Sequence, residues 1–153
     1  MVEIDQVDKD ILRVLQTDAR ISITDLAKAV GRSKTPIAAR LRRMEEAGLI
    51  TGYRAQIDPL KLNINHVSYV EVRLANTRQA ALSDFNKAVR QIPEVEECYM
   101  TAGGFDYLLK IRSRDMEHYR TIMSDKVSAL PHIASTSTYV AMEAVVEHAD
   151  IRI

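Results

Sequence analysis

The segment from Ser22 to Gly48 restricts the fold most, because local signals mark where its helices begin and end. Ser22 starts the sequence SITD, a capping-box pattern that favours the first turn of a helix. Gly31 can adopt the left-handed backbone conformation that ends this helix, and Ser33 can cap the next one. Pro36 falls in the first turn of that next helix, where its missing N–H has no intrahelical acceptor. The segment therefore predicts two helices joined by a tight turn.

The residue spacing within this segment is that of a helix-turn-helix. Counted from Ile23 as the first residue, Ala27 is the fifth, Gly31 the ninth and Ile37 the fifteenth. The small residue allows close packing, the glycine forms the turn, and the apolar residue holds the second helix against the first. Apolar residues at helical spacing in 7–17 predict a preceding helix, which completes a three-helix unit.

Positive charge is concentrated on the helix after the turn, although the whole chain has 21 Lys+Arg and 21 Asp+Glu. From Arg32 to Arg43 there are five basic residues and no acidic residue. On a helical wheel, Ile37, Leu41 and Met44 share the face that must be buried. The opposite face is small, hydroxylated and basic, which suits the major groove of DNA.

We therefore predict that this helix contacts double-stranded DNA through Arg32, Ser33, Lys34, Thr35, Ala39, Arg40, Arg42 and Arg43. Arg42 and Arg43 are expected to face outward. For Arg40, which lies nearer the buried face, a phosphate contact and an ion pair with an acid of the first helix are both open. The alternative for the whole face is a solvated basic surface on a helical bundle. Capping, the turn glycine and the separation of charge favour DNA.

Strand and helix patterns alternate in the second part of the chain. Strands are predicted at 66–75, 95–101, 106–112 and 134–146, and helices at 79–92 and 114–130. This βαββαβ order is typical of the ferredoxin-like fold, so the chain is expected to be α+β. The expected division is a helix-turn-helix domain at 1–52, a linker strand and hinge at 53–65, and the βαββαβ domain at 66–153.

The first strand of this second domain has apolar residues in both of its registers. Val67 and Tyr69 fall on one side, and Val70 and Val72 on the other. A sheet with two apolar faces needs a cover on the face that its helices leave open, and a second subunit can supply it. We therefore predict a homodimer, whose two-fold symmetry matches a pseudo-palindromic operator.

Two segments resemble landmarks of the Lrp/AsnC (leucine-responsive, feast/famine) family of transcription regulators. They are SITDLAKAVGRSKTPIAARLRRMEEAGLITGY and VEECYMTAGGFDYLLKIR, and the resemblance extends from about Val7 to Val146. It implies a helix-turn-helix of the winged type and a C-terminal domain for ligand sensing and dimerisation. It also implies assembly of dimers into tetramers or octamers, with an amino-acid effector bound at contacts between dimers.

The resemblance places the effector site at Met100, Thr101, Ala102, Gly103, Gly104, Asp106, Ala134 and Thr136. Physically, a Gly-Gly turn can present backbone N–H groups to a carboxylate. Asp106 can accept hydrogen bonds from an α-ammonium group. The alternative is an ordinary hairpin turn, in which Asp106 bonds to the backbone of the turn.

Residue patterns typical of catalysis or metal binding are missing from the sequence. The four histidines lack metal-ligand spacing, and no P-loop, nucleophile elbow or dinucleotide-binding motif occurs. Cys98 is the single cysteine, which favours a reducing compartment, and no apolar run is long enough to span a membrane. We expect a cytoplasmic, nucleoid-associated regulator without a cofactor, although the fold alone leaves an enzyme possible.

Two further functions are compatible with these patterns. One is an architectural protein that compacts DNA with little sequence preference, and the other is a ligand-binding module without DNA activity. The segments FNKAVRQIPEVEECYMTAGGFDYLLKIRS and LPHIASTSTYVAME are similar to those of regulators of amino-acid catabolism, including proline degradation.

Overall fold

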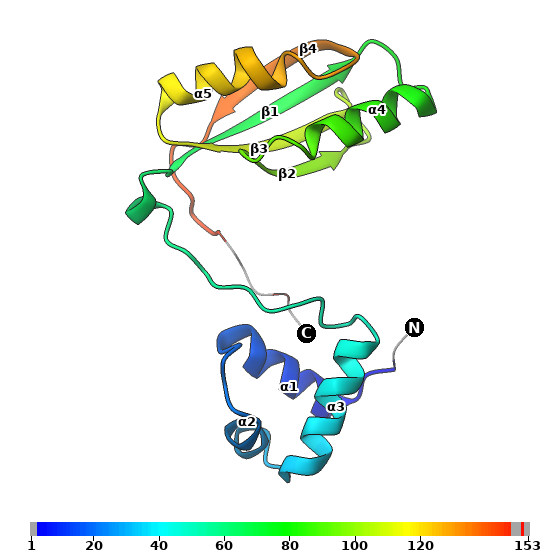
Figure 1. Ribbon diagram of the computed structural model, residues 1–153, viewed down its shortest axis with the longest axis vertical. Helices are drawn as coiled ribbons and strands as arrows, with labels where there is room; N and C mark the ends of the chain where they lie inside the picture. Colours follow the sequence, from blue (N-terminus) through cyan, green and yellow to red (C-terminus); the bar gives the residue numbers. More distant parts are fainter. Residues whose placement is uncertain (1–2, 148–150, 152–153) are drawn as a thin grey trace. The chain divides into compact units, whose positions relative to one another are not determined.

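The computed structural model describes residues 3–147 and 151, and they form two units (Figure 1). One unit contains the residues up to 56 together with those from 146 onward, and the other contains residues 57–145. The segment expected to be a linker, 53–65, is thus divided between them. Within the described residues, no helix has both the length and the apolar character needed to cross a membrane.

The first unit is built from three helices whose ends follow local signals in the sequence. They are α1 (Gln6–Thr17), α2 (Ile23–Ala29) and α3 (Lys34–Glu46). The Ser22 Oγ accepts a hydrogen bond from the Asp25 N–H at 3.1 Å and caps α2. Gly31 follows α2 with φ +65°, and Gly48 follows α3 with φ +69°, the left-handed conformation that favours glycine. The turn at Gly31 is where the sequence predicts it.

A small apolar core holds these helices together. Its buried members come from all three helices: Ile11, Leu26, Ala27, Ile37 and Met44. Ala27 and Ile37 are the small and apolar positions of the helix-turn-helix spacing, so the packing that this spacing predicts is confirmed.

The short strand expected at the start of residues 53–65 does not form. Residues 53–58 have no regular secondary structure, and a 3-10 turn (Leu60–Leu62) follows them. The Asp58 Oδ1 accepts a hydrogen bond from the Leu60 N–H at 2.9 Å, which makes a turn at Asp58-Pro59. A strand is stable only when its backbone pairs with another strand, and 53–58 has no such pairing among the described residues.

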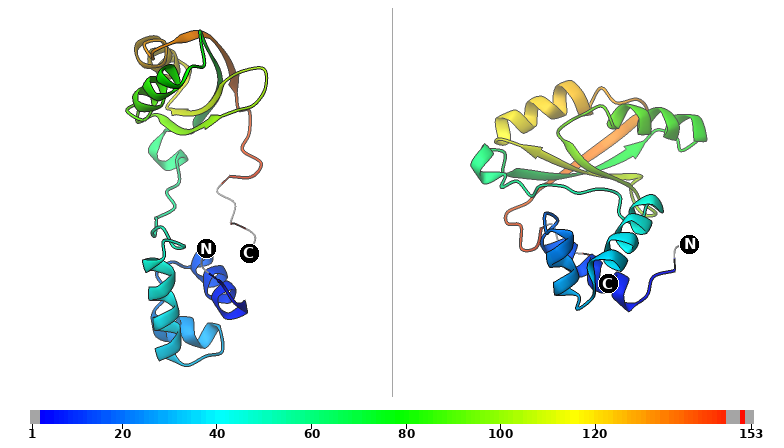
Figure 2. Two further views of the ribbon diagram at one scale, coloured as in Figure 1. Left: turned by 90° about the vertical axis from the view of Figure 1, so that its right-hand side faces the viewer. Right: turned by 60° about the horizontal axis from the view of Figure 1, so that its bottom comes forward.

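The second unit is a four-stranded antiparallel sheet in the order β2-β3-β1-β4. Its elements are β1 (His66–Leu74), α4 (Gln79–Val89), β2 (Val95–Met100), β3 (Tyr107–Ser113), α5 (Met116–Ile122) and β4 (Ile133–Val140). Helix α5 continues as a π-helical turn, Met123–Val127. Figure 2 shows α4 and α5 on the same face of the sheet. The predicted α+β class and ferredoxin-like βαββαβ order are confirmed.

Strand β4 is shorter than the 134–146 expected from the sequence. Its last residue, Val140, pairs with Ser68 of β1, and the Ala141 N–H donates to the Val67 carbonyl at 3.0 Å. Because β1 begins at His66, residues 142–146 have no strand of the described chain beside them. The pairing ends where the neighbouring strand ends, which the composition of 141–146 alone does not reveal.

The core of this unit lies between the sheet and its two helices. Val70 and Val72 of β1 are fully buried against Phe85 of α4 and against Tyr107 and Leu109 of β3. The Phe85 and Tyr107 rings lie 4.4 Å apart between centroids. This face of the sheet supplies most of the apolar burial that stabilises the unit.

The opposite face of the sheet carries exposed aromatic side chains. Tyr69 of β1 pairs directly with Tyr139 of β4, and Tyr99 of β2 pairs with Leu108 of β3. All three tyrosines are exposed. Strand β1 therefore has apolar groups in both registers, as the sequence indicates. Val70 and Val72 are buried in the core, whereas in the other register Tyr69 is exposed and Val67 is buried.

Candidate DNA-binding and effector-binding sites

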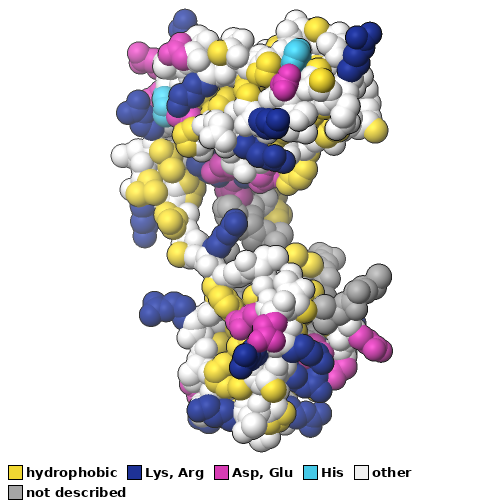
Figure 3. Space-filling model, turned by 45° about the vertical axis from the view of Figure 1, so that its right-hand side comes forward, with side chains coloured by type: hydrophobic (Ala, Val, Ile, Leu, Met, Phe, Trp, Pro, Cys, Tyr) yellow, Lys and Arg dark blue, Asp and Glu magenta, His cyan; other side chains and the backbone are white. Residues whose placement is uncertain are grey.

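The outward face of α3 carries most of the residues predicted to contact DNA. Lys34, Thr35, Ala39 and Arg42 are all exposed there, as are Arg32 and Ser33 just before the helix. The Arg42 side chain is 79% exposed and its Nε donates to the Glu46 Oε1 at 2.7 Å, one turn further along. Figure 3 shows Lys and Arg side chains on the surface of the first unit, with acidic groups beside some of them.

Two other arginines of α3 bind acidic groups of α1. Arg40 Nη1 lies 2.7 Å from Asp5 Oδ2 and 2.9 Å from Asp8 Oδ1, and Arg43 Nη2 lies 2.6 Å from Asp8 Oδ2. The Asp8 side chain is only 1% exposed. Arg40 thus makes the ion pair that was one of its two alternatives.

The orientation expected for Arg43 was wrong. Residues three apart share a helix face, so Arg43 follows Arg40 toward α1 and does not extend away with Arg42. Its side chain is still 49% exposed, which leaves part of the guanidinium at the surface. DNA contact by Arg40 and Arg43 stays a prediction.

Asp5 and Asp8 also cap α1. The Asp5 Oδ1 accepts a hydrogen bond from the Asp8 N–H at 2.9 Å, and the Asp8 Oδ2 accepts one from the Asp5 N–H at 3.1 Å. The same two carboxylates therefore begin α1 and attach α3 to it. The sequence signal was present as two acids spaced like a capping box, but only the fold brings them to the arginines.

These contacts lower the pKa of Asp5 and raise the pKa of Arg40. The pKa of Asp5 is lowered from 3.8, first by the hydrogen bond from the Asp8 N–H and then by the one from Arg40. The pKa of Arg40 is raised, first by its hydrogen bond to Asp5 and then by the one to Asp8. Both shifts favour the charged forms that make the contact.

We expect Asp5→Asn to make the first unit less stable at neutral pH but not in acid. A lowered pKa in the folded state gives stability that is complete above the unfolded pKa and is lost as pH falls through the folded pKa. Asparagine keeps an acceptor for the cap but cannot pair with Arg40. The measurement is thermal unfolding followed by circular dichroism from pH 7 to pH 2. Above pH 3.8, the ordinary pKa of Asp5, the unfolding midpoints of variant and wild type should differ. Below that pH the two midpoints should converge. A difference that is constant with pH would contradict the assignment, and Glu3→Gln, at an exposed carboxylate outside the cap, is the control.

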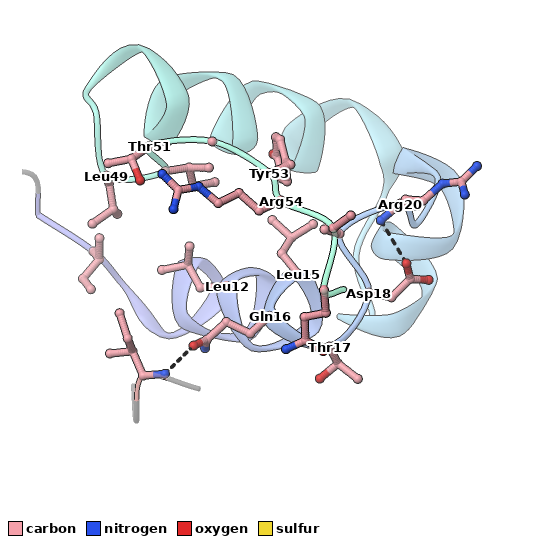
Figure 4. Close-up of a pocket in the computed structure, with 17 residues that line it drawn as sticks. Leu12, Leu15, Gln16, Thr17, Asp18, Arg20, Leu49, Thr51, Tyr53 and Arg54 are labelled. Carbon is pink, nitrogen blue, oxygen red and sulfur yellow. Dashed lines mark hydrogen bonds between the residues drawn. The ribbon is translucent and has the colours of Figure 1, made fainter. Parts of the chain in front are cut away.

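A cavity of about 830 Å³ lies elsewhere in the first unit. Figure 4 shows Leu12 and Leu15 of α1 on one side of it, with Leu49, Tyr53 and Arg54 from the segment after α3 on the other. None of the eight residues predicted to contact DNA lines this cavity. The Tyr53 hydroxyl donates to the Glu45 Oε1 at 2.7 Å, and partial burial together with this bond raises the pKa of Tyr53 to about 12.

The loop between β2 and β3, predicted to bind the effector, is closed by its own hydrogen bonds. The Thr101 Oγ1 donates to the Phe105 carbonyl at 2.8 Å, and the Thr101 N–H donates to the Asp106 carbonyl at 2.9 Å. Neither Gly103 nor Gly104 has φ in the left-handed region, so the turn does not depend on glycine for its backbone conformation. A Cβ at Gly103 would meet no atom within 4 Å, which leaves this side of the loop open.

Asp106 attaches this loop to β1. Its Oδ2 accepts a hydrogen bond from the Leu74 N–H at 2.8 Å, and its own N–H donates to the Val72 carbonyl at 2.9 Å. The carboxylate thus bonds to the backbone of the neighbouring strand, which differs from both the effector contact and the turn contact considered from the sequence. Because Thr136 of β4 pairs with Val72 from the other side, the fold brings the two predicted parts of the effector site to the same end of β1.

No group of three His, Cys, Asp or Glu residues in the described part of the chain is arranged to hold a metal ion.

Comparison with known protein families assigns both units. Residues 4–51 match a winged helix-turn-helix DNA-binding domain, and residues 67–151 match the Lrp/AsnC ligand binding domain. The chain belongs to the Lrp/AsnC family.

Curated relatives support this assignment over almost the full length. A proline dehydrogenase transcriptional activator from Rhodobacter capsulatus is 67% identical over 144 residues, covering 94% of each chain. One from Rhizobium radiobacter is 48% identical, covering 95% of this chain and 93% of the relative. The leucine-responsive regulatory protein of Escherichia coli (strain K12) is 41% identical and covers 94% and 87%.

Solved structures of Lrp/AsnC-like regulators have the same fold. An AsnC family transcriptional regulator from Agrobacterium tumefaciens matches with a TM-score of 0.93 and 34% identity, covering 97% of each chain. A regulator from Neisseria meningitidis in complex with L-Met matches with a TM-score of 0.89 and 27% identity, covering 95% and 94%. The chain is therefore a DNA-binding transcription regulator with a ligand-binding domain, and it is not an enzyme.

Proposed function

We propose that this protein is a sequence-specific transcription regulator of amino-acid metabolism, and that an amino acid controls its binding to DNA. The observation that carries this proposal is the high identity over nearly the whole chain to relatives named as activators of proline dehydrogenase. L-Proline is accordingly the effector we propose, and proline degradation the regulated process. The protein would act in the cytoplasm, at the nucleoid.

The DNA interface we propose is centred on the outward face of α3. Among the residues that the structure describes, Arg42 is held only by Glu46 on the same helix, and an exposed pair of this kind contributes about 0.3–0.5 kcal/mol. DNA can therefore displace Glu46 at little cost, and the guanidinium can then bind guanine O6 and N7. Lys34 and Thr35 in the first turn of α3 are placed for phosphate contacts, which set the register on the duplex.

Arg40 and Arg43 take a different part in this proposal. Their bonds to Asp8 fix the distance between α3 and α1, and so orient the outward face. The exposed part of Arg43 can still contact a phosphate at the rim of the interface. We therefore expect these two residues to contribute to DNA affinity mainly by holding α3 in place.

A homodimer is the assembly that the open face of the sheet favours, with dimers joining into tetramers or octamers. Tyr69, Tyr99 and Tyr139 would be covered by the same face of a second subunit, since buried aromatic groups favour association. Two α3 helices related by a two-fold axis would then bind the two halves of a pseudo-palindromic operator.

We propose that the effector binds where the β2–β3 loop and the start of β4 meet β1. The neighbouring structure that contains L-Met supports a ligand of amino-acid size in this type of domain. The hydrogen bonds of Thr101 and Asp106 within the chain make the loop a preformed support. Ligand binding would shift the equilibrium between two arrangements of the DNA-binding units by its different affinity for each.

The test of the DNA interface is Arg42→Ala. We expect specific binding to weaken by about 1–3 kcal/mol, because a bidentate contact to guanine is lost. Fluorescence anisotropy at fixed salt would measure the affinity for a DNA site that the wild-type protein selects from a random library. The matched control is Arg13→Ala in α1, an exposed arginine in a similar pair with Asp10.

Three results would argue against this function. Unchanged DNA affinity of Arg42→Ala would show that α3 is not the helix that reads the DNA sequence. Uniform protection of DNA in a footprint, in place of one protected operator, would indicate an architectural protein. Affinity that does not fall with rising salt would exclude DNA phosphates as the partner.

A further inference from the structure

Arg73 lies between the two segments proposed to bind the effector. It is on β1, which runs between β3 and β4, and its backbone pairs with Ser135 at the start of β4. On the other side, its Nη2 lies 3.8 Å from the position that a Cβ atom at Gly104 would occupy. The Arg73 guanidinium therefore reaches the β2–β3 loop from the strand beside it.

The Arg73 side chain is not used in holding the fold. In the part of the chain that the structure describes, it is exposed and makes no hydrogen bond or ion pair. Arg40 and Arg43, by contrast, are bound to carboxylates. The guanidinium of Arg73 keeps its hydrogen-bond donors available to a ligand.

The β2–β3 loop bonds to the backbone of β1 next to Arg73. The Asp106 carboxylate accepts the Leu74 N–H, and the register of β1 against β4 shifts at Arg73 and Leu74. The extra residue at this shift is Ala134 on β4, opposite Arg73 and Leu74. Asp106 therefore holds the β1 backbone next to Arg73.

The side chains of Thr101 and Asp106 in the loop already have hydrogen-bond partners. The Thr101 hydroxyl donates to the Phe105 carbonyl, and Asp106 is an acceptor with a negative charge that repels a carboxylate. Among these groups, Arg73 alone supplies a positive charge. Guanidinium groups bind carboxylates through two parallel N–H···O bonds, which gives both energy and orientation.

We propose that Arg73 binds the α-carboxylate of the amino-acid effector and selects ligands that carry a free carboxylate. This inference rests on the proposed function, because it assumes an amino-acid effector at the β2–β3 loop. It adds a residue and a chemical requirement that neither the sequence motif nor the family match specifies.

Isothermal titration calorimetry of the full chain tests the assignment. The wild type is first titrated with the twenty L-amino acids, L-proline included, and the tightest binder and its α-carboxamide are then used as probes. We expect Arg73→Ala to bind the amino acid roughly 10- to 100-fold more weakly, since a bond between charged groups is lost. Arg73→Lys, which keeps the charge but not the paired donors, should recover part of this loss. The α-carboxamide should bind wild type and Arg73→Ala equally weakly.

The control is Arg120→Ala, which removes an exposed arginine on α5 and should bind the amino acid like the wild type. Wild-type affinity in Arg73→Ala would overturn the role of Arg73 and leave the amino-acid effector intact. A carboxamide that binds the wild type as tightly as the acid would overturn the carboxylate requirement. If no amino acid binds the wild type, the proposed effector fails and the role of Arg73 fails with it.

Discussion

Replacing Asp8 with alanine is expected to destabilise the first unit by about 2–4 kcal/mol. The side chain is almost fully buried, caps α1 and binds both Arg40 and Arg43 of α3. Its loss leaves Arg43 without its carboxylate and Arg40 with Asp5 alone, and a partly buried charge that loses its partner is costly. Because α3 would no longer be held against α1, we also expect weaker binding to every DNA sequence, specific or not.

Thermal unfolding of the full chain, followed by circular dichroism, would measure this change. The control is Asp10→Ala, which removes a half-exposed carboxylate of α1 that bonds to Gln6 and Arg13 of the same helix. We expect that control to change stability by less than about 0.5 kcal/mol. A midpoint for Asp8→Ala as high as that of Asp10→Ala would show that the Asp8 contacts do not hold the unit together.

Phe85→Ala is expected to destabilise the second unit by about 3–5 kcal/mol. Phe85 is fully buried between α4 and the sheet, and its ring packs against that of Tyr107. Alanine leaves a cavity that the surrounding strands cannot fill, because the sheet holds them in place. The same unfolding measurement reports the change, with Met116→Ala on the exposed side of α5 as the control.

The two variants should affect different unfolding transitions. The cores of the two units share no residue, so each unit has its own source of apolar stability. We expect Asp8→Ala to lower the midpoint of one transition and Phe85→Ala that of the other. A single transition lowered equally by both variants would show that the units unfold together.

The helices of the first unit and the βαββαβ order of the second were predictable from the sequence. Ser22, Gly31 and Gly48 act on the backbone within a few residues of themselves, so their effect does not depend on the rest of the fold. The strand at 53–58 and the last residues of β4 were predicted wrongly for the opposite reason. A strand exists only where another strand pairs with it, and that partner is distant in sequence.

The residues of the candidate sites were also predictable only in part. The positive charge and apolar stripe of α3 are visible in the sequence because both repeat with the period of one helix. The separation of Arg42 from Arg40 and Arg43 required the position of α1, which brings Asp8 to one side of α3. A helical wheel predicts where a side chain points relative to the axis of its own helix. It does not predict an ion pair, because the partner lies on a neighbouring helix.

The effector loop shows most clearly which contacts the sequence alone could not predict. In the sequence, two glycines and a nearby acid indicate a turn at Gly103, Gly104 and Asp106. The structure gives Asp106 a backbone partner on β1 and brings Arg73 next to Gly104, a residue 31 positions away in the chain. Short-range signals therefore determined the elements and their order. Strand pairing and helix packing, which act between distant residues, decided which charged groups are bound within the protein and which remain available to DNA or a ligand.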